Sequence, residues 1–354
     1  MKPQIVLITG SNIGGAERVT VLYAKILKQA GLDVYLLLYQ NGKSCDLKEF
    51  IPKDIPYEVV AGRIRYLAFY LTKRLGSLKP EVVFTTLFHV ALSASVATWL
   101  LRKPYTFVVR DCNTPSRHGD WQIRLARILF KKCDVLVAQT EEMRQQMIEA
   151  YHLASEKVVT IYNPIDKMLI RDGLKETVNM NPHHCNYLAV GRIAPQKDYV
   201  TMLKAFAIVR KQQPNSHLYI IGPVDVAYKV ILDQLIYEYQ LHNWVFFEGF
   251  QINPFKYIEA ADVFVLSSEY EGLPNVLMEA MYLGKPVVAT RCIPFVQQVV
   301  KEGINGYTTK VGDYESFAEK MLLASKLKGM EKFIDTNKSD EKVLELFGRR
   351  FYKL

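Results

Sequence analysis

The chain has 354 residues, of which 49% are hydrophobic and 12% aromatic, and its formal net charge is +9. This length and apolar content exclude a disordered chain and favour two α/β domains, each with its own core. The positive charge suits nucleic acid, an anionic membrane or a phosphate-bearing small molecule, and five cysteines without a C-x-x-C pair argue against a disulfide framework and for a reducing compartment.

Strands and helices alternate along the first 162 residues. The sequence predicts a first strand at 4–9 and a first helix at 15–30, which ends at Gly31. Further strands are expected at 33–39, 81–86, 105–110, 134–138 and 158–162, and further helices at 63–78, 89–101, 121–130 and 141–151. Because short apolar strands separated by helices bury both faces of a sheet, we expect a parallel sheet here.

Two segments bear on the location of the protein. The first ten residues lack the long apolar stretch of a signal peptide. Residues 82–101 have about the length of a membrane span and no full charge, but Pro80 precedes them, β-branched residues cluster at their start and His89 lies among them. We interpret them as a buried strand and a buried helix, and expect a cytoplasmic protein, soluble or peripheral on the inner face of the plasma membrane.

The segment 63–79 combines five cations with aromatic and aliphatic residues at helical spacing. Such a helix could lie on an anionic bilayer or hold the pyrophosphate of a polyprenyl-linked sugar. The alternative is an ordinary amphipathic helix that packs Leu67, Leu71 and Leu75 on the sheet and leaves its charges solvated. The candidate acceptor or membrane cations are Arg63, Arg65, Lys73 and Arg74.

A second alternation of strands and helices follows a polar linker at about 163–185. Strands are expected at 187–190, 217–221, 245–247, 263–267 and 286–289, and helices at 199–212, 226–240 and 275–283. We therefore predict two doubly wound, Rossmann-like domains at 1–166 and 167–336 that face a central cleft at the carboxyl ends of their strands. A last helix in 337–354 is expected to pack back on the N-terminal domain.

The segment 267–279 carries the first candidate site. A strand ends at Ser267, a loop follows, and Pro274 begins a helix, so the N–H groups of Asn275, Val276 and Leu277 are expected to point outward as an anion site. Glu279 lies inside an otherwise apolar helix, where a charge is costly without hydrogen bonds. Glu279 and Glu271 could accept from sugar hydroxyls; the alternatives are a structural ion pair for Glu279 and a solvated loop charge for Glu271.

The segment 191–198 supplies two cations, Arg192 and Lys197, directly after another strand. A planar guanidinium and a point charge at this place could hold a diphosphate. The chain contains no Asp-x-Asp and no histidine cluster, so the usual carboxylate ligands of a divalent metal are missing. We predict that the two cations and the helix start replace a metal in stabilising a departing diphosphate.

These motifs resemble those of a known family. The segments EGLPNVLMEAMYLGKPVVAT (271–290), GRIAPQKDY (191–199) and, more weakly, GGAERV (14–19) are similar to the family 4 glycosyltransferases of the GT-B fold. The resemblance covers the whole chain and is strongest over 186–290. It implies a bacterial enzyme of the polysaccharide or lipid-linked glycan type that retains the anomeric configuration and uses a nucleotide sugar, with a UDP-sugar as the default.

The resemblance also implies roles for individual residues. Arg192 and Lys197 would bind the donor diphosphate, Glu279 the ribose and Glu271 the transferred sugar. The remaining implied donor residues surround the base, the phosphates or the sugar, and they are Gly14, Gly15, Gly222, Gly249, Phe250, Gly272, Leu273, Pro274, Asn275 and Val276.

The sequence departs from the family on the acceptor side. Many relatives carry a histidine at the strand end that matches 109–110, where this chain reads Val-Arg-Asp-Cys-Asn. The acceptor-side polar residue is therefore open among Arg110, Asp111 and His118, and we favour Arg110. Gln297 and Gln298 stand where relatives often show glutamate, and Pro223 stands where a small residue is common.

We predict a retaining hexosyl- or N-acetylhexosaminyltransferase without metal or other cofactor, acting on a glycan or a polyprenyl-diphosphate-linked acceptor. A nucleotide-sugar epimerase or hydrolase on the same fold is the nearest alternative. A dinucleotide oxidoreductase would need a G-x-G-x-x-G spacing that residues 10–15 lack. A carbohydrate- or nucleic-acid-binding module would not explain Glu271 and Glu279 beside two cations, and since no nucleic-acid module is recognisable we expect no such partner.

Overall fold

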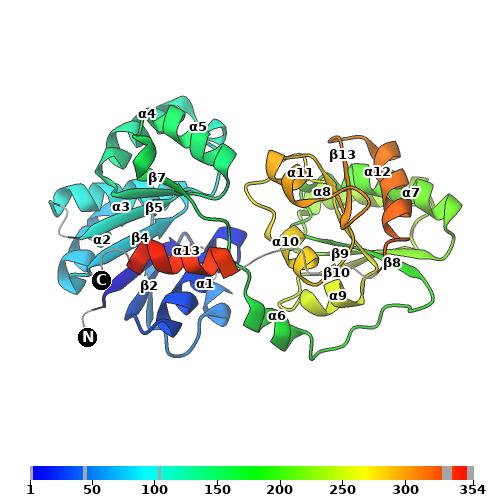
Figure 1. Ribbon diagram of the computed structural model, residues 1–354, viewed down its shortest axis with the longest axis horizontal. Coiled ribbons are helices and arrows are strands. Elements are labelled where there is room, and N and C mark those ends of the chain that lie inside the picture. Colours follow the sequence, from blue (N-terminus) through cyan, green and yellow to red (C-terminus); the bar gives the residue numbers. More distant parts are fainter. Residues whose placement is uncertain (1–2, 43–45, 103–104, 329–336, 349–354) are drawn as a thin grey trace. The chain divides into compact units, whose positions relative to one another are not determined.

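The computed structural model describes residues 3–42, 46–102, 105–328 and 337–348. The chain divides into two compact units. Unit 1 comprises Met1–Pro164 and Asp335–Leu354, and unit 2 comprises Ile165–Ile334. Each unit contains one β-sheet with helices packed on it (Figure 1).

Within the described residues, unit 1 holds a seven-stranded sheet in the order β3-β2-β1-β4-β5-β6-β7, and all neighbouring strands are parallel. The strands are β1 (Ile5–Gly10), β2 (Val34–Gln40), β3 (Tyr57–Ala61), β4 (Val82–Thr86), β5 (Thr106–Arg110), β6 (Val135–Ala138) and β7 (Val158–Thr160). The helices are α1 (Gly15–Gln29), α2 (Ile64–Leu78), α3 (Phe88–Leu100), α4 (Asp120–Leu129), α5 (Glu141–Tyr151) and α13 (Asn337–Gly348).

Both faces of this sheet are buried, as expected for a parallel sheet. Every residue of β1 and β4 is buried, and two hydrophobic clusters cover the two faces. Helix α13 contributes Val343 and Phe347 to one of them, and the Phe347 ring lies 5.7 Å from that of Phe84. Residues 349–354 of the predicted C-terminal helix lie outside the described residues.

The segment 82–101 forms the buried strand β4 and the largely buried helix α3, which confirms our interpretation of it. Seven of the α3 side chains are buried, including Phe88 and Val90. Among the described residues, no helix combines the length and the apolar content that a membrane crossing needs.

In its described residues, unit 2 holds a six-stranded parallel sheet in the order β10-β9-β8-β11-β12-β13. The strands are β8 (Cys185–Val190), β9 (Ser216–Ile221), β10 (Val245–Gly249), β11 (Val263–Leu266), β12 (Val287–Thr290) and β13 (Gly306–Thr309). The helices are α6 (Lys167–Gly173), α7 (Tyr199–Gln212), α8 (Val226–Glu238), α9 (Phe255–Ala260), α10 (Asn275–Tyr282), α11 (Pro294–Val299) and α12 (Tyr314–Ala324).

Strand order reverses between β1 and β4 in unit 1 and between β8 and β11 in unit 2. In open parallel sheets, ligands bind outside the carboxyl ends of the strands at such a reversal. The segments 191–198 and 267–279 follow β8 and β11 directly. The two candidate motifs therefore meet where a doubly wound sheet places its ligands.

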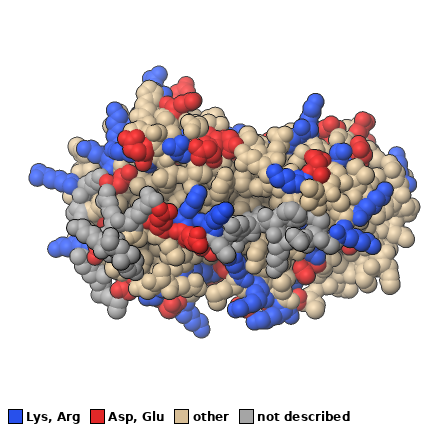
Figure 2. Space-filling view, viewed as in Figure 1, with Lys and Arg blue, Asp and Glu red and all other residues tan. Residues whose placement is uncertain are grey.

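Charged side chains are spread over the visible face of both units. Lys and Arg are interspersed there with Asp and Glu, and they do not form one continuous basic patch on this face (Figure 2). The net charge of +9 therefore gives no location for a partner by itself, and local surfaces have to be considered one by one.

Candidate active site

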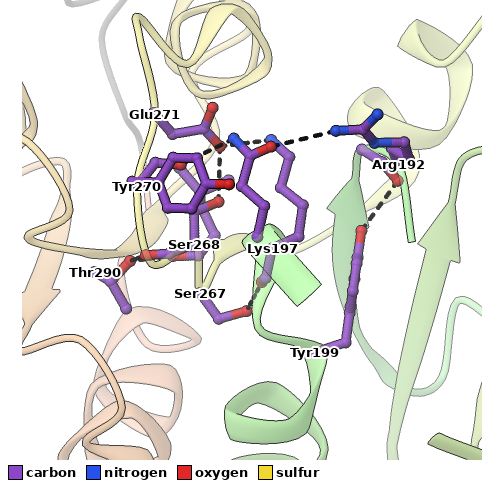
Figure 3. Close-up of polar contacts among 11 residues, drawn as sticks. Arg192, Lys197, Tyr199, Ser267, Ser268, Tyr270, Glu271 and Thr290 are labelled. Atoms are coloured by element: carbon purple, nitrogen blue, oxygen red, sulfur yellow. Dashed lines mark hydrogen bonds and ion pairs between the residues drawn. The ribbon is translucent and has the colours of Figure 1, made fainter. Parts of the chain in front are cut away.

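Two loops of unit 2 are tied together at the carboxyl ends of the neighbouring strands β8 and β11. Glu269 N donates to Gln196 O at 2.9 Å, and Gln196 Nε2 donates to Tyr270 O at 3.0 Å. Ser267 Oγ also donates to Lys197 O at 2.7 Å (Figure 3). Because these bonds cross between the loops in both directions, the cation-bearing loop and the acid-bearing loop hold each other in place.

Lys197 and Glu271 form an ion pair between these loops. Lys197 Nζ lies 2.5 Å from Glu271 Oε1, and only 16% and 10% of the two side chains are exposed. Ser268 Oγ donates to the same oxygen at 2.7 Å. The sequence predicted separate contacts for these residues, one to phosphate and one to sugar, and this structure brings their charges together.

Arg192 lies on the open side of the same cluster. Its side chain is exposed, and its NH2 group makes one long hydrogen bond of 3.4 Å to Gln196 Oε1. In Figure 3 the Arg192 head group points toward the end of the Lys197 side chain, whose ammonium is bonded to Glu271. Both cations therefore lie in the loop after β8, whereas their contact with a diphosphate stays a prediction.

Glycines follow three adjacent strands next to these cations. Gly191, Gly222 and Gly249 stand at the carboxyl ends of β8, β9 and β10, where Gly191 N donates to Ile221 O and Gly222 N to Gly249 O, both at 2.8 Å. Gly222 has a φ of +151°, and a Cβ there would overlap the Gly191 carbonyl. A side chain is therefore excluded at position 222, and Phe250 follows Gly249 as a half-exposed ring.

The start of α10 differs from the prediction in one N–H group. Leu277 N and Met278 N both donate to Pro274 O, at 3.1 and 3.3 Å. Leu277 N–H is therefore not available to an anion, because the carbonyl of the first-turn proline takes it. Helix α10 begins at Asn275 as expected, and the loop before it contains Gly272 and the buried residues Leu273 and Pro274.

Glu279 is buried in α10 among apolar neighbours. It is 9% exposed, and Leu277, Met278 and Met281 around it are buried as well. A carboxylate is retained in such a place only with hydrogen-bonding partners. Its burial agrees with the sequence-based expectation, whereas the ribose contact stays a prediction.

Two residues that the motifs did not single out, Thr290 and Cys292, lie next to the cluster of Arg192, Lys197 and Glu271. Thr290 Oγ1, at the end of β12, donates to Ser268 O at 2.5 Å and so supports the loop that carries Glu271. Burial, reinforced by the charge of Glu271, raises the pKa of the Cys292 thiol to about 12. A thiol with such a pKa is protonated at neutral pH. One indication of the support from Thr290 was present in the sequence, because Ser267 and Ser268 lie at the end of a strand.

In unit 1, Asp111 and His118 come together. Asp111 Oδ2 accepts from Tyr151 OH at 2.7 Å and lies 3.2 Å from His118 Nε2. The His118 ring stacks on Phe88 with a centroid separation of 3.7 Å. Packing and the carboxylate together fix the orientation of this imidazole, so it is not a loosely held loop histidine.

Arg110, by contrast, is a core residue of unit 1. Its side chain is 0% exposed. The guanidinium donates to Asn163 Oδ1 and to Cys112 Sγ, the latter at 3.0 Å, and it lies over the Tyr23 ring. This burial argues against our preference for Arg110 as the acceptor-side residue, because a group with no exposed surface does not reach a substrate.

The Gly14-Gly15 turn is shaped by a buried acid. A Cβ at Gly14 would overlap the Glu17 carboxylate, and Gly10 approaches the same group closely. Burial raises the pKa of the Glu17 carboxyl, while the charge of Arg110 opposes that shift. A side chain at position 14 would therefore displace the Glu17 carboxylate, and a contact of the turn to the donor stays a prediction.

One of the candidate cations on and beside α2, Arg74, is bound by neighbouring side chains of unit 1. Arg74 Nε is 2.7 Å from Glu58 Oε2, and Arg74 NH2 donates to Tyr35 OH at 3.1 Å, so this guanidinium serves the fold. Arg63, Lys73 and Arg74 line a cavity of about 670 Å³ together with Tyr66 and Phe69. The Arg65 guanidinium lies over the Tyr66 ring. Packing of Leu67, Leu71 and Leu75 on the sheet is confirmed.

Within the described residues, no group of three or more His, Cys, Asp or Glu side chains is placed to hold a metal ion.

Comparison with known families gives matches over both units. Residues 178–340 match the family "Glycosyl transferases group 1", and residues 13–168 match "Glycosyltransferase Family 4". The lipopolysaccharide core biosynthesis glycosyltransferase LpsD of Rhizobium meliloti is 33% identical over 78% of this chain and 75% of that protein.

A further relative and a solved structure also match the chain. The N-acetylgalactosamine-N,N'-diacetylbacillosaminyl-diphospho-undecaprenol 4-alpha-N-acetylgalactosaminyltransferase of Campylobacter jejuni is 26% identical over 78% of this chain and 77% of that protein. The crystal structure of Anabaena Alr3699/HepE in complex with UDP and glucose superposes with a TM-score of 0.82 at 20% identity, over 98% of this chain and 100% of the other. This chain spans about half the length of several other curated relatives that it matches.

Proposed function

The chain belongs to the family 4 glycosyltransferases, and from this premise we propose that it is a retaining enzyme that moves a hexose or N-acetylhexosamine from a UDP-sugar to a glycan or lipid-linked acceptor. Enzymes of this family transfer sugars from nucleotide sugars. We assign the donor to 167–336, the acceptor to 1–166, and the C-terminal helix in 337–354 to the acceptor side.

The observation that carries the proposal is the cluster of Arg192, Lys197 and Glu271 at the reversal of strand order in unit 2. An ammonium group has three N–H donors, and the bond to Glu271 uses one of those of Lys197. The other donors and the Arg192 guanidinium bind the donor diphosphate, together with the N–H groups of Asn275 and Val276.

Glu271 has acceptor capacity left for the transferred sugar. The bonds from Lys197 and Ser268 both reach Oε1. Oε2 then accepts from a sugar hydroxyl, while the backbone of Gly272, Leu273 and Pro274 lies along the sugar. Lys197 and Glu271 thus fix phosphate and sugar relative to each other, which orients the anomeric carbon.

The chemical step needs no nucleophile from the enzyme in this proposal. The diphosphate departs from the face that the acceptor hydroxyl approaches and takes up the proton of that hydroxyl. Arg192 and Lys197 stabilise the charge that develops on the leaving group and take the place of a metal ion. The neutral thiol of Cys292 takes no part in it.

The nucleotide is proposed to lie along the glycine-bearing strand ends. Gly222 and Gly249 leave room for the base beside Phe250, and Glu279 accepts from the ribose hydroxyls. Uridine is favoured because the structurally similar HepE was crystallised with UDP and glucose.

The acceptor is proposed to be a glycan or a polyprenyl-diphosphate-linked sugar, and the protein to be cytoplasmic or peripheral on the plasma membrane. The printed activity of the Campylobacter jejuni relative, which names a diphospho-undecaprenol, supports this class. The cavity beside α2 presents Arg63 and Lys73, with Arg65 nearby, for a pyrophosphate. Asp111 and His118 supply the polar group on the acceptor side.

The test is a thermal-shift panel of UDP-, GDP- and ADP-sugars on the full chain. A ligand that binds the folded state raises the melting temperature. We expect UDP-sugars to raise the melting temperature, and we expect Lys197→Ala and Glu279→Ala each to abolish this shift. The control is Lys229→Ala, which removes a lysine paired with Asp233 on α8 and should keep the shift. Melting without ligand checks that each variant folds.

Two outcomes would overturn the proposal. A full shift in both site variants removes Lys197 and Glu279 from the donor site. Consumption of the UDP-sugar at the same rate with and without acceptor, with an epimerised or hydrolysed product, shows a nucleotide-sugar epimerase or hydrolase instead of a transferase.

A further inference from the structure

Helix α4 of unit 1 carries three large apolar side chains that its own fold does not bury. Trp121, Leu125 and Ile128 are 67%, 37% and 68% exposed. Their spacing of four and three residues places them on one face of the helix. The opposite face carries the buried Ala126, and the helix is held to α5 by a bond of 2.8 Å from Arg127 Nε to Ala150 O. The exposed apolar ridge therefore lies on a helix that is anchored to the rest of unit 1.

Exposed cations accompany this ridge. Arg124 lies three residues after Trp121 and four before Ile128, and so on the same face. Lys131 and Lys132 follow in the short 3₁₀ turn Phe130–Lys132. All three side chains are exposed. The sequence from 117 to 132 contains five cations and a single acid, Asp120. The ridge is thus both apolar and locally positive.

Exposed apolar residues alone would mean little, because single ones are common on protein surfaces. Helix α8 of unit 2 also has exposed apolar side chains and can be compared with α4. Val226, Val230 and Tyr237 are exposed there to a similar extent. On α8, however, Lys229 is paired with Asp233, and the helix carries more acids than bases. The combination of an apolar ridge with surplus positive charge distinguishes α4 from α8.

We propose that α4 and the 3₁₀ turn after it form a docking surface for an anionic lipid bilayer. Trp121, Leu125 and Ile128 enter the boundary between headgroups and acyl chains, and Arg124, Lys131 and Lys132 contact lipid phosphates. Tryptophan suits this boundary, and long cationic side chains reach back from it to the headgroups. The surface deepens the proposed function, since it brings the enzyme to a lipid-linked acceptor, but lipid binding itself needs no nucleotide sugar.

A bilayer fits this surface better than a second copy of the chain. A two-fold contact would place the same patch on both partners. Arg124, Lys131 and Lys132 of one copy would then lie against the positively charged patch of the other, and like charges in contact are repulsive. An anionic membrane offers both the apolar layer and the negative charge that the patch lacks.

The experiment is co-sedimentation of the full chain with vesicles, without any nucleotide sugar. One set contains phosphatidylcholine alone and the other equal parts of phosphatidylcholine and phosphatidylglycerol. We expect binding to the anionic vesicles, with a blue shift of tryptophan emission that is absent in Trp121→Phe. The double variant Trp121→Ser/Ile128→Ser should lose binding. The triple variant Arg124→Gln/Lys131→Gln/Lys132→Gln should bind roughly 100-fold more weakly, at about fivefold for each cation.

The matched control is Val230→Ser/Tyr237→Ser on α8, which removes equally exposed apolar side chains and should bind as the wild type does. Retention of the donor-induced thermal shift shows that the α4 variants fold and keeps a failure here distinct from a failure of the proposed function. The proposal is overturned if the wild type ignores anionic vesicles or if the α4 variants bind them unchanged. It is also overturned if the wild type is a dimer that Trp121→Ser/Ile128→Ser turns into monomers.

Discussion

The ion pair between Lys197 and Glu271 links the stability of unit 2 to the proposed chemistry. Both side chains are mostly buried at a separation of 2.5 Å. Removing one partner of a buried pair typically costs about 3–5 kcal/mol, because the other charge is left without compensation. The loops of β8 and β11 are thus held by the groups proposed to bind phosphate and sugar, and a substitution there should keep the shape of the side chain.

Glu271→Gln separates the two roles of this acid. The amide keeps the shape but removes the charge that neutralises Lys197, so we expect UDP to bind at least as tightly as in the wild type. A neutral acceptor holds a sugar hydroxyl less well, so kcat/KM should fall roughly 10- to 100-fold, the equivalent of about 1.5–3 kcal/mol.

Calorimetric titration with UDP and steady-state kinetics with the UDP-sugar measure the two effects. Glu238→Gln, on the exposed part of α8, is the control and should change neither value. Weaker UDP binding together with an unchanged kcat/KM would contradict the assignment of Glu271 to the sugar.

The sequence was informative about which residues carry charge at the site, and less so about their contacts. Arg192, Lys197 and Glu271 were found because they follow strands in a specific spacing. The Lys197–Glu271 pair and the bridging Gln196 depend on how two loops 74 residues apart pack together. The burial of Arg110 was missed for a similar reason. Its partner Asn163 is 53 residues away, and only the folded sheet brings them together.

At the scale of elements, the strands with an apolar run and most of the longer helices were predicted, whereas the edge strands β3 and β13, three short helices and α12 were not. The edge strand β3 is partly exposed along its length, and β13 has four residues, so neither shows a continuous apolar run. Helices α6, α9 and α11 have six or seven residues, and helices this short form through tertiary packing rather than local preference. Helix α12 did carry a signal, since Asp313 caps it and Phe317 and Met321 repeat at helical spacing, but it was not predicted.

The glycine-bearing strand ends give a prediction for Gly222. Gly222→Ala would place its Cβ against the Gly191 carbonyl at a φ of +151°, so the backbone of β8 or β9 has to move. We expect a loss of more than about 2 kcal/mol in the free energy of unfolding and of the donor-induced thermal shift as well. Thermal melting with and without the UDP-sugar measures both.

Gly249→Ala is the matched control for Gly222→Ala. Its φ of +67° is also unfavourable for a side chain, but a Cβ there meets nothing within 4 Å. The control should therefore lose only about 1 kcal/mol, the cost of a left-handed backbone conformation. Equal losses in the two variants would show that backbone strain, and not the close approach of β8 and β9, makes glycine necessary at position 222.

At the scale of the whole molecule, the two units repeat one architecture with different chemistry. Both have the strand order of a doubly wound sheet, and in both a polar cluster lies at the carboxyl end of a strand. Unit 2 has the exposed Arg192 and the mostly buried Lys197 there. The corresponding cation of unit 1, Arg110, is completely buried, and the polar pair is Asp111 with His118. This asymmetry is the physical basis for assigning the anionic donor to unit 2.

The same asymmetry predicts how the enzyme responds to removal of metal ions. If Arg192 and Lys197 supply the positive charge for the leaving diphosphate, turnover should be unchanged after treatment with a chelator and should not rise when Mg²⁺ is added back. Because electrostatic stabilisation of a leaving group is worth several kcal/mol, its loss would be plain in the rate. Transfer to an acceptor, followed by release of UDP, is the measurement, and Lys197→Ala shows in the same assay what loss of a cation does. A rate that collapses with the chelator and returns with Mg²⁺ would mean that these two side chains do not replace a metal.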